Sequence, residues 1–208
     1  MPTPDFDLYL VTDRNQTRGR DLLWVLEQAL EGGVRAIQLR EKDLGGKELF
    51  ELAEKTRDLC DRYGALLFVN DRIDVALAVD ADGVQLGNAS IPIKSARDLL
   101  GPEKFIGAST HSLAEAKAAE LSGAELILFG PVYFTPSKAA YGKPQGLIAL
   151  KEIVEKISSP VYAIGGIKPE NIEEAKQRGI RGVALISAIM SADNPKEATQ
   201  RILWQLKR

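Results

Sequence analysis

Gln38-Leu39-Arg40-Glu41-Lys42-Asp43 ends an apolar run, residues 34–39, in a group of charged side chains. Side chains alternate along a strand, so Gln38, Arg40 and Lys42 are expected to point toward one place where the strand ends. Several other apolar runs of the chain also end in polar, charged or glycine-rich residues. This recurrence predicts an architecture in which the strand ends carry the chemistry.

Short apolar runs typical of strands occur eight times along the chain. They are residues 8–11, 36–39, 66–69, 83–86, 105–108, 126–129, 161–164 and 182–186. Segments with helical periodicity alternate with them, at about residues 20–31, 47–63, 72–79, 93–100, 113–122, 147–157, 169–178 and 195–207. Glycines follow several of these helices and are expected to end them with a left-handed residue: Gly32, Gly33, Gly64, Gly101, Gly123 and Gly179. Pro169 and Pro195 suit first helical turns.

Eight strand and helix units in about 200 residues favour a closed barrel over an open doubly wound sheet. The first strand is followed by Thr12-Asp13-Arg14-Asn15, without the glycine fingerprint of a dinucleotide-binding turn. No linker or change in composition indicates a second domain. We therefore predict one α/β domain over residues 1–208, a single (β/α)8 TIM barrel, with its site at the carboxyl ends of the strands.

The composition limits the partners that the chain can have. Lys and Arg number 27 and Asp and Glu number 29, which argues against a nucleic-acid partner bound by bulk charge. The single cysteine, Cys60, excludes an internal disulfide and fits a reducing compartment. No signal peptide or membrane-spanning run is recognisable, so a cytoplasmic protein without a membrane partner is expected. The sequence leaves the oligomeric state open.

The last two predicted strands end in a pattern typical of a phosphate site. Gly165 and Gly166 follow the seventh strand, and Ile186 and Ser187 end the eighth. Glycine lets backbone N–H groups approach an oxyanion, and barrels often bind phosphate after these two strands. The alternative is that the two glycines only permit a tight turn.

The loop after the sixth strand carries two hydroxyls and an ammonium, Thr135, Ser137 and Lys138. These groups suit a diphosphate, and the length of the loop suggests a lid. A solvated polar loop is the alternative.

The third and fifth strands end in further candidates. Asp71 is a natural Mg2+ ligand because this hard cation prefers carboxylate and phosphate oxygens, and the neighbouring Asn70 suits a heterocycle. Alternatively, Asn70 or Asp71 caps the next helix. After the fifth strand, Ser109 is a better ligand contact than His111, the only histidine, for which no base-and-acid arrangement can be argued.

Six motifs in a fixed order make the chain resemble a known family. They are residues 38–43, 70–72, 107–111, 130–138, 163–167 and 186–189. With them, nearly the whole chain resembles the thiamine phosphate synthase branch of a superfamily that includes thiazole tautomerase. The resemblance implies a transferase that joins hydroxymethylpyrimidine diphosphate to thiazole phosphate, giving thiamine phosphate and diphosphate.

The resemblance also implies a role for each matching position. Arg40, Lys42 and Lys138 would be catalytic by stabilising the departing diphosphate, and Asp71 would hold Mg2+. The other substrate contacts would come from Gln38, Asn70, Ser109, Thr135, Ser137, Gly166, Ile186 and Ser187.

Two positions depart from the patterns of the superfamily. Ser90 stands where the synthase usually has a second metal carboxylate, and Pro131 stands where the tautomerase has its histidine. Proline cannot shuttle protons, whereas charge stabilisation is spread over many contacts, so the synthase is favoured. A thiazole tautomerase and a non-catalytic thiamine phosphate-binding barrel are the alternatives.

Overall fold

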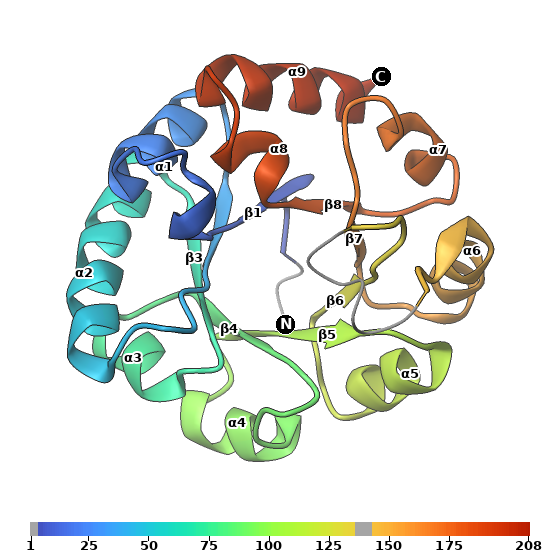
Figure 1. The fold of residues 1–208 in the computed structure, drawn as a ribbon. Helices are drawn as coiled ribbons and strands as arrows, with labels where there is room; N and C mark the ends of the chain where they lie inside the picture. The colour runs from blue at the N-terminus through green and yellow to red at the C-terminus, as the bar shows by residue number, and fades with distance from the viewer. Residues whose placement is uncertain (1–3, 136–142) are drawn as a thin grey trace.

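Eight parallel strands close into a barrel in the computed structural model, which describes residues 4–135 and 143–208 (Figure 1). The strands follow one another around the barrel in chain order: β1 (Leu8–Val11), β2 (Ala36–Leu39), β3 (Leu66–Asn70), β4 (Gly83–Leu86), β5 (Phe105–Thr110), β6 (Leu126–Phe129), β7 (Val161–Ile164) and β8 (Gly182–Leu185). Pairing of β1 with β8, in the register Leu8 to Val183, closes the barrel. The predicted (β/α)8 fold is confirmed.

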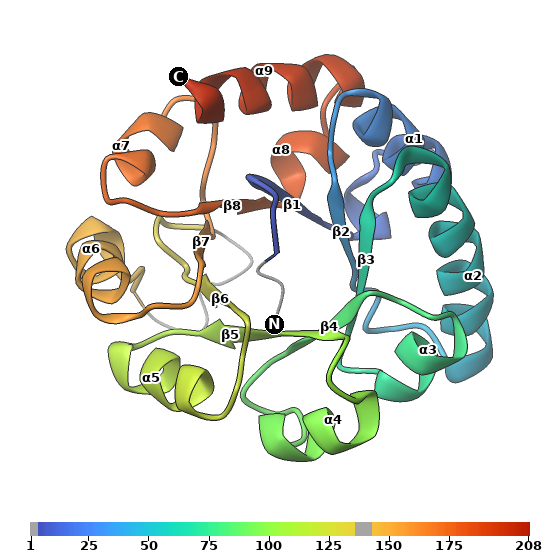
Figure 2. The same cartoon turned by 180° about the vertical axis from the view of Figure 1, so that it is seen from behind.

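Helices form a ring around the barrel, as the two opposite views show (Figures 1 and 2). They are α1 (Leu22–Glu31), α2 (Gly46–Tyr63), α3 (Ile73–Ala78), α4 (Ile93–Leu100), α5 (Leu113–Leu121), α6 (Gly146–Lys156), α7 (Ile172–Lys176) and α9 (Pro195–Lys207). Two short elements were not predicted: the 3-10 helix η1 (Arg14–Gln16) after β1 and helix α8 (Ser187–Met190) after β8. Helix α8 contacts both η1 and α9, inside the outer ring.

The predicted helix ends are mostly confirmed. Five of the six glycines named above have positive φ, but Gly32 has φ of −70° and leaves the left-handed position to Gly33. Pro195 begins α9 as predicted. The prediction for Pro169 is wrong, because residues 168–171 form a turn in which Asn171 Oδ1 accepts a hydrogen bond from Lys168 N at 2.8 Å, and α7 begins after it. In the described part of the chain, no helix is long and apolar enough to cross a membrane.

The barrel interior is filled by aromatic rings. Phe6 lies 5.3 Å from Tyr9 and 4.8 Å from Tyr162 between ring centroids, and Tyr9 lies 5.2 Å from Phe68. The Tyr162 hydroxyl donates to the carbonyl of Phe6 at 2.9 Å, and its burial raises the pKa of the phenol. A second and larger apolar core fills the space between the barrel and the helices. The interior is therefore a packed core, and in barrels of this kind the carboxyl ends of the strands carry the chemistry.

Acidic side chains bind the backbone at the amino-terminal ends of the strands. Asp82, just before β4, accepts from Leu67 N at 2.7 Å, and Glu125, just before β6, accepts from Ile106 N at 2.8 Å. Each acid also forms an ion pair with an arginine of the helix ring: Asp82 with Arg57 of α2, and Glu125 with Arg97 of α4. This end of the barrel therefore contributes to stability rather than to the site.

Candidate active site

Several predicted site residues share the inward face of the barrel. The interior cluster contains Ala36 of β2 and Phe68 of β3, with Phe105 of β5 packed against it. Side chains on one face recur every second residue, so Gln38, Asn70 and Ser109 continue the same face toward the carboxyl ends. The strand register agrees, since Gln38 pairs with Phe68.

Buried amide groups line this end of the interior. Gln38 is 2% exposed and Gln85 of β4 is 1% exposed. Gln85 Nε2 donates to Ser109 Oγ at 3.0 Å. A Cβ on Gly107 would lie 2.3 Å from Gln85 Oε1, so a larger residue there would displace the Gln85 side chain. The pairing of Gln85 with Ser109 was not predicted, because it depends on the register of β4 with β5.

Three buried polar atoms in this region have no hydrogen-bond partner among the described residues: Gln38 Nε2, Gln85 Oε1 and Tyr9 Oη. Burial raises the pKa of Tyr9 well above its ordinary value, and the nearby Gln38 offsets part of this. The opening at the carboxyl ends of the strands is called the mouth of the barrel. Buried polar atoms are normally paired, so a polar ligand that enters the mouth would give some of these three atoms a hydrogen-bond partner.

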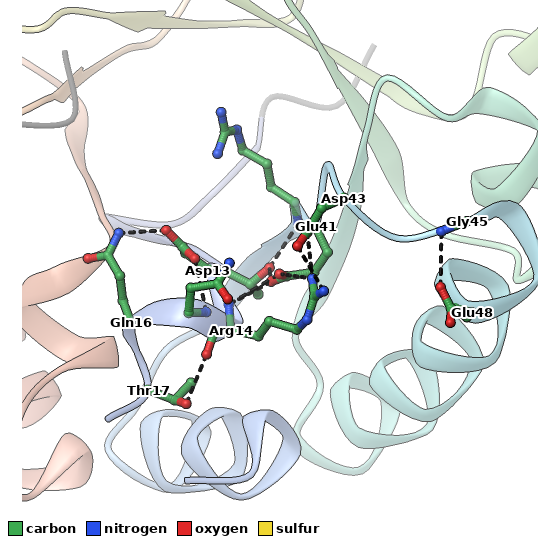
Figure 3. Close-up of polar contacts among 11 residues, drawn as sticks. Asp13, Arg14, Gln16, Thr17, Glu41, Asp43, Gly45 and Glu48 are labelled. Carbon is green, nitrogen blue, oxygen red and sulfur yellow. Dashed lines mark hydrogen bonds and ion pairs between the residues drawn. The ribbon is translucent and has the colours of Figure 1, made fainter. Parts of the chain in front are cut away.

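The residues that directly follow β2 are held by the loop after β1 (Figure 3). The Glu41 carboxylate accepts from Thr12 Oγ1 at 2.6 Å, from Arg14 N at 3.2 and 3.1 Å, and from Arg14 Nη1 at 3.3 Å. The same guanidinium donates to both carboxylate oxygens of Asp43, at 2.6 and 2.9 Å. Thr12 Oγ1 in turn accepts from Arg40 N at 2.9 Å. Sequence reasoning missed these contacts, because partners 27 to 29 residues apart leave no local pattern.

The side chains of Arg40 and Lys42 make no ion pair with any residue in the described ranges. This holds although Glu41 lies between them in the sequence and Asp43 follows Lys42. The acids contact Arg14 instead, which holds the pKa of Asp43 below its ordinary value. Arg40 is half-buried and Lys42 is exposed. Two cations are therefore available to an anionic ligand at the end of β2.

Asp71 and Ser90 come together from two neighbouring loops. The Ser90 hydroxyl donates to Asp71 Oδ1 and accepts from Gly87 N, the latter at 2.6 Å. The other carboxylate oxygen accepts from Asn70 Nδ2 at 2.9 Å. Asp71 has φ of 61°, an uncommon conformation for a residue other than glycine, and its N–H donates to Gln85 O at 3.1 Å.

The alternative role of Asn70 and Asp71 as helix caps is wrong, because Arg72 is the N-cap residue of α3 and no side chain caps that helix. No group of three or more metal-binding His, Cys, Asp or Glu side chains occurs within residues 4–135 and 143–208. Among the described residues, a metal bound at Asp71 would therefore not have three such side chains as ligands.

The glycine turn after β7 packs against the loop after β6. Gly165 and Gly166 have φ of 91° and 68°, and Cβ atoms there would lie 2.5 Å from Pro131 and 2.7 Å from Phe134 O. Tyr133 N donates to Gly165 O at 2.9 Å. The two glycines therefore do form a tight turn that only residues without a Cβ fit. It is compatible with a phosphate site, because α8 begins with the exposed Ser187 directly after Ile186, and barrels often bind phosphate at a short extra helix of this kind.

His111 contributes to the same loop through its ring. His111 Nδ1 is hydrogen-bonded to Gly130 O, and the backbone N–H of His111 donates to Glu115 at 2.7 Å. His111 thus makes structural contacts through its ring and its backbone. Thr135 is half-buried at the end of the described part of this loop, whereas Ser137 and Lys138 lie outside the described residues.

The fold and the candidate site together define a class: a (β/α)8 barrel with two cations outside any ion pair in the described residues, a carboxylate and buried amides at the carboxyl ends of its strands. The chain belongs to the thiamine monophosphate synthase family, whose model matches residues 8–189.

Individual relatives match over nearly their full length. One from Geobacter sulfurreducens is 54% identical over 98% of this chain and 95% of its own. The thiamine-phosphate synthase of Desulfitobacterium hafniense is 43% identical over 97% of this chain and 98% of its own. The structure of the thiamine phosphate pyrophosphorylase from Pyrococcus furiosus is 43% identical, with a TM-score of 0.88, covering 97% of this chain and 95% of that one.

Proposed function

We propose that the protein is a thiamine-phosphate synthase, a transferase that joins hydroxymethylpyrimidine diphosphate to thiazole phosphate. The observation that carries the proposal is the pair of cations at the end of β2, which have no acidic partner in the described part of the chain although Glu41 and Asp43 are their neighbours in sequence. Family membership and relatives named as synthases support the same conclusion.

The reaction requires stabilisation of charge more than proton transfer. The bond between the pyrimidine methylene carbon and the diphosphate oxygen breaks, and the electron pair leaves with diphosphate. The methylene cation, stabilised by the pyrimidine ring, is then attacked by the lone pair of the thiazole nitrogen, which forms the new carbon–nitrogen bond. The thiazole nitrogen carries no proton in this step, so no general base is needed. A mouth with several cations and one structural histidine suits this chemistry.

We assign the cations to the departing diphosphate. Arg40 and Lys42 would bind its oxygens from β2, and Lys138 would do so from the loop after β6, with Thr135 and Ser137 donating further hydrogen bonds. Lys138 and Ser137 are assigned from the sequence motif alone, because both lie outside the described residues.

The two rings would occupy neighbouring positions in the mouth. Gln38 and Ser109 are suited to the pyrimidine, because Gln38 Nε2 is buried without a partner in the described chain and Ser109 is held by Gln85. Asn70, at the end of β3, is assigned to the diphosphate region. Gly166, Ile186 and Ser187 are assigned to the thiazole phosphate, because the glycine turn and α8 follow the paired strands β7 and β8. Holding both rings at attack distance would be the second contribution to rate.

The residues around Asp71 fit a magnesium ion that is shared with the substrate. Mg2+ is commonly held by one or two carboxylates together with substrate phosphates, and Asp71 supplies one carboxylate. The Ser90 hydroxyl donates a hydrogen bond to Asp71 and accepts one from Gly87 N, so it orients the Asp71 carboxylate. When bound, Mg2+ would neutralise part of the charge on the diphosphate.

No contact among the described residues at the carboxyl ends of the strands favours the tautomerase alternative. It needs a titratable group where Pro131 lies, and His111, the single histidine, is hydrogen-bonded to a backbone carbonyl. A cytoplasmic location is also proposed, supported by the free and buried Cys60.

The test is to mix purified protein with both substrates, with and without Mg2+, and to measure thiamine phosphate after oxidation to its fluorescent product. The expected result is product formation that depends on Mg2+. A folded protein that binds diphosphate but gives no product under either condition would refute the synthase assignment, and interconversion of thiazole tautomers would then be measured.

A further inference from the structure

The four residues at the end of β2 divide into two pairs by their contacts. Glu41 and Asp43 both pair with Arg14 (Figure 3), whereas Arg40 and Lys42 form no ion pair within the described ranges. A third cation, Arg14 of the loop after β1, forms ion pairs with both acids.

The contacts of Arg14 are strong for a surface loop. Its guanidinium donates two parallel hydrogen bonds to Asp43, at 2.6 and 2.9 Å, and this fork geometry is the favoured one for arginine and a carboxylate. The Glu41 side chain is 1% exposed and accepts from Thr12 as well as from Arg14. Thr12 is fully buried and also holds the backbone of Arg40. The segment is therefore fixed on one side by a buried carboxylate and on the other by an ion pair.

We propose that Arg14 is a positioning residue that keeps Glu41 and Asp43 away from Arg40 and Lys42, so that these two cations remain available to the substrate diphosphate. The proposal rests on the proposed function for the identity of the anion. Arg14 itself would not touch the substrate. Of the two acids, Asp43 is the one that can move, because its side chain is 57% exposed whereas that of Glu41 is buried. Without Arg14, the carboxylate of Asp43 would be free to pair with the adjacent Lys42 or with Arg40.

The test uses inorganic diphosphate as the probe and isothermal titration calorimetry on the full chain at low ionic strength. Arg14→Met removes the charge but keeps an apolar stem, and it is expected to weaken diphosphate binding about tenfold. The double variant Arg14→Met with Asp43→Asn removes the competing acid as well, and it is expected to regain the original affinity to within about twofold. In turnover assays, the KM for the pyrimidine diphosphate should rise in the single variant while the KM for thiazole phosphate stays the same.

Arg181→Met is the matched control. Arg181 is 34% exposed, close to the 33% of Arg14, and it also pairs with two acids, but it stands just before β8 at the opposite end of the barrel. We expect a comparable change in thermal stability and an unchanged affinity for diphosphate. The single variant Asp43→Asn is a second route if Arg14→Met does not fold, and it should bind diphosphate at least as tightly as the unmodified protein.

Each outcome decides between the two proposals. The positioning role is refuted if Arg14→Met binds diphosphate normally, if the double variant stays as weak as the single one, or if Asp43→Asn alone weakens binding. Failure of the unmodified protein to bind diphosphate also refutes it. The synthase assignment fails separately, if the variants follow the expected order in calorimetry but the unmodified protein makes no thiamine phosphate.

Discussion

Replacing Ser90 with aspartate tests the arrangement around Asp71. The Ser90 hydroxyl now donates to Asp71, so Ser90→Asp replaces a hydrogen bond with a second negative charge. Two unit charges about 4 Å apart repel by about 4 kcal/mol at an effective dielectric constant of about 20 and by about 1 kcal/mol in bulk water. Asp71 is exposed and Ser90 half-buried, so the lower figure applies. We expect the free energy of unfolding to fall by about 1 kcal/mol without metal, or Tm by roughly 2–4 °C for a chain of this size.

Mg2+ should reverse the sign of this effect. Two carboxylates that repel each other can share a divalent cation, and a ligand at about 100 times its dissociation constant stabilises the folded state by about 2.7 kcal/mol. The assay is thermal unfolding of Ser90→Asp and of the unmodified protein over a Mg2+ series, followed by the half-saturating Mg2+ concentration in the synthase reaction. The variant should gain more stability from Mg2+ and reach half-saturation at a lower concentration.

Ser90→Asn is the control, since asparagine has nearly the same shape as aspartate and can accept a hydrogen bond from Gly87 N without adding charge. It should show neither the loss of stability nor the gain with Mg2+. The reasoning is refuted if Ser90→Asp and Ser90→Asn have the same Tm at every Mg2+ concentration and the same half-saturation. Ser90 would then not face the metal.

Three further predictions concern the glycine turn, the amino-terminal end of the barrel and the buried thiol. Gly166→Ala should destabilise the protein and raise the KM for thiazole phosphate, because the new Cβ would lie 2.7 Å from atoms of the loop after β6. Gly64→Ala is the control, since Gly64 also has positive φ but a Cβ there would have nothing within 4 Å. In urea unfolding this control should lose only about 1–2 kcal/mol through backbone strain. Glu125→Ala should lower the free energy of unfolding by about 1–3 kcal/mol by leaving Ile106 N without its acceptor, with kcat per folded molecule unchanged; a lower kcat would contradict this. Burial raises the pKa of Cys60 from 9.0 to about 12, so the unfolded thiol ionises first: its contribution to stability is complete below pH 9 and is lost between pH 9 and about 12. A thiol reagent at about pH 8 should react slowly until the protein unfolds, and fast labelling of the folded protein would show that Cys60 is not protected.

The fold could be predicted because the local signals agreed with one another. Five strands, among them β4 and β7, have the predicted bounds, since each is a short, mainly apolar run followed directly by a polar residue or a glycine. Strand β5 extends to Thr110, beyond the predicted end, because Ser109 and Thr110 continue the ladder with β6 although they are polar. The short helix α8 was missed, because four residues do not display a helical period.

The site could be predicted only where a single strand end carries the signal. Asp71 and Ser90 were identified at their positions, and the structure adds that they are in contact. The network of Thr12, Arg14 and Glu41 was not predicted, because it forms between two strand ends that only the barrel brings together. The roles assigned to all of the site residues stay predictions, and Ser137 and Lys138 lie outside the described residues.

Closure of the barrel by β1 and β8 affects how the protein folds during synthesis. Strand β1 pairs with β2, which follows it within about 25 residues, but its other edge pairs with residues around Val183. On the ribosome, that edge therefore has no native partner until most of the chain has been made. An unpaired strand edge is a site for aggregation, so the nascent protein is vulnerable for nearly the whole of its synthesis and becomes protected at the end.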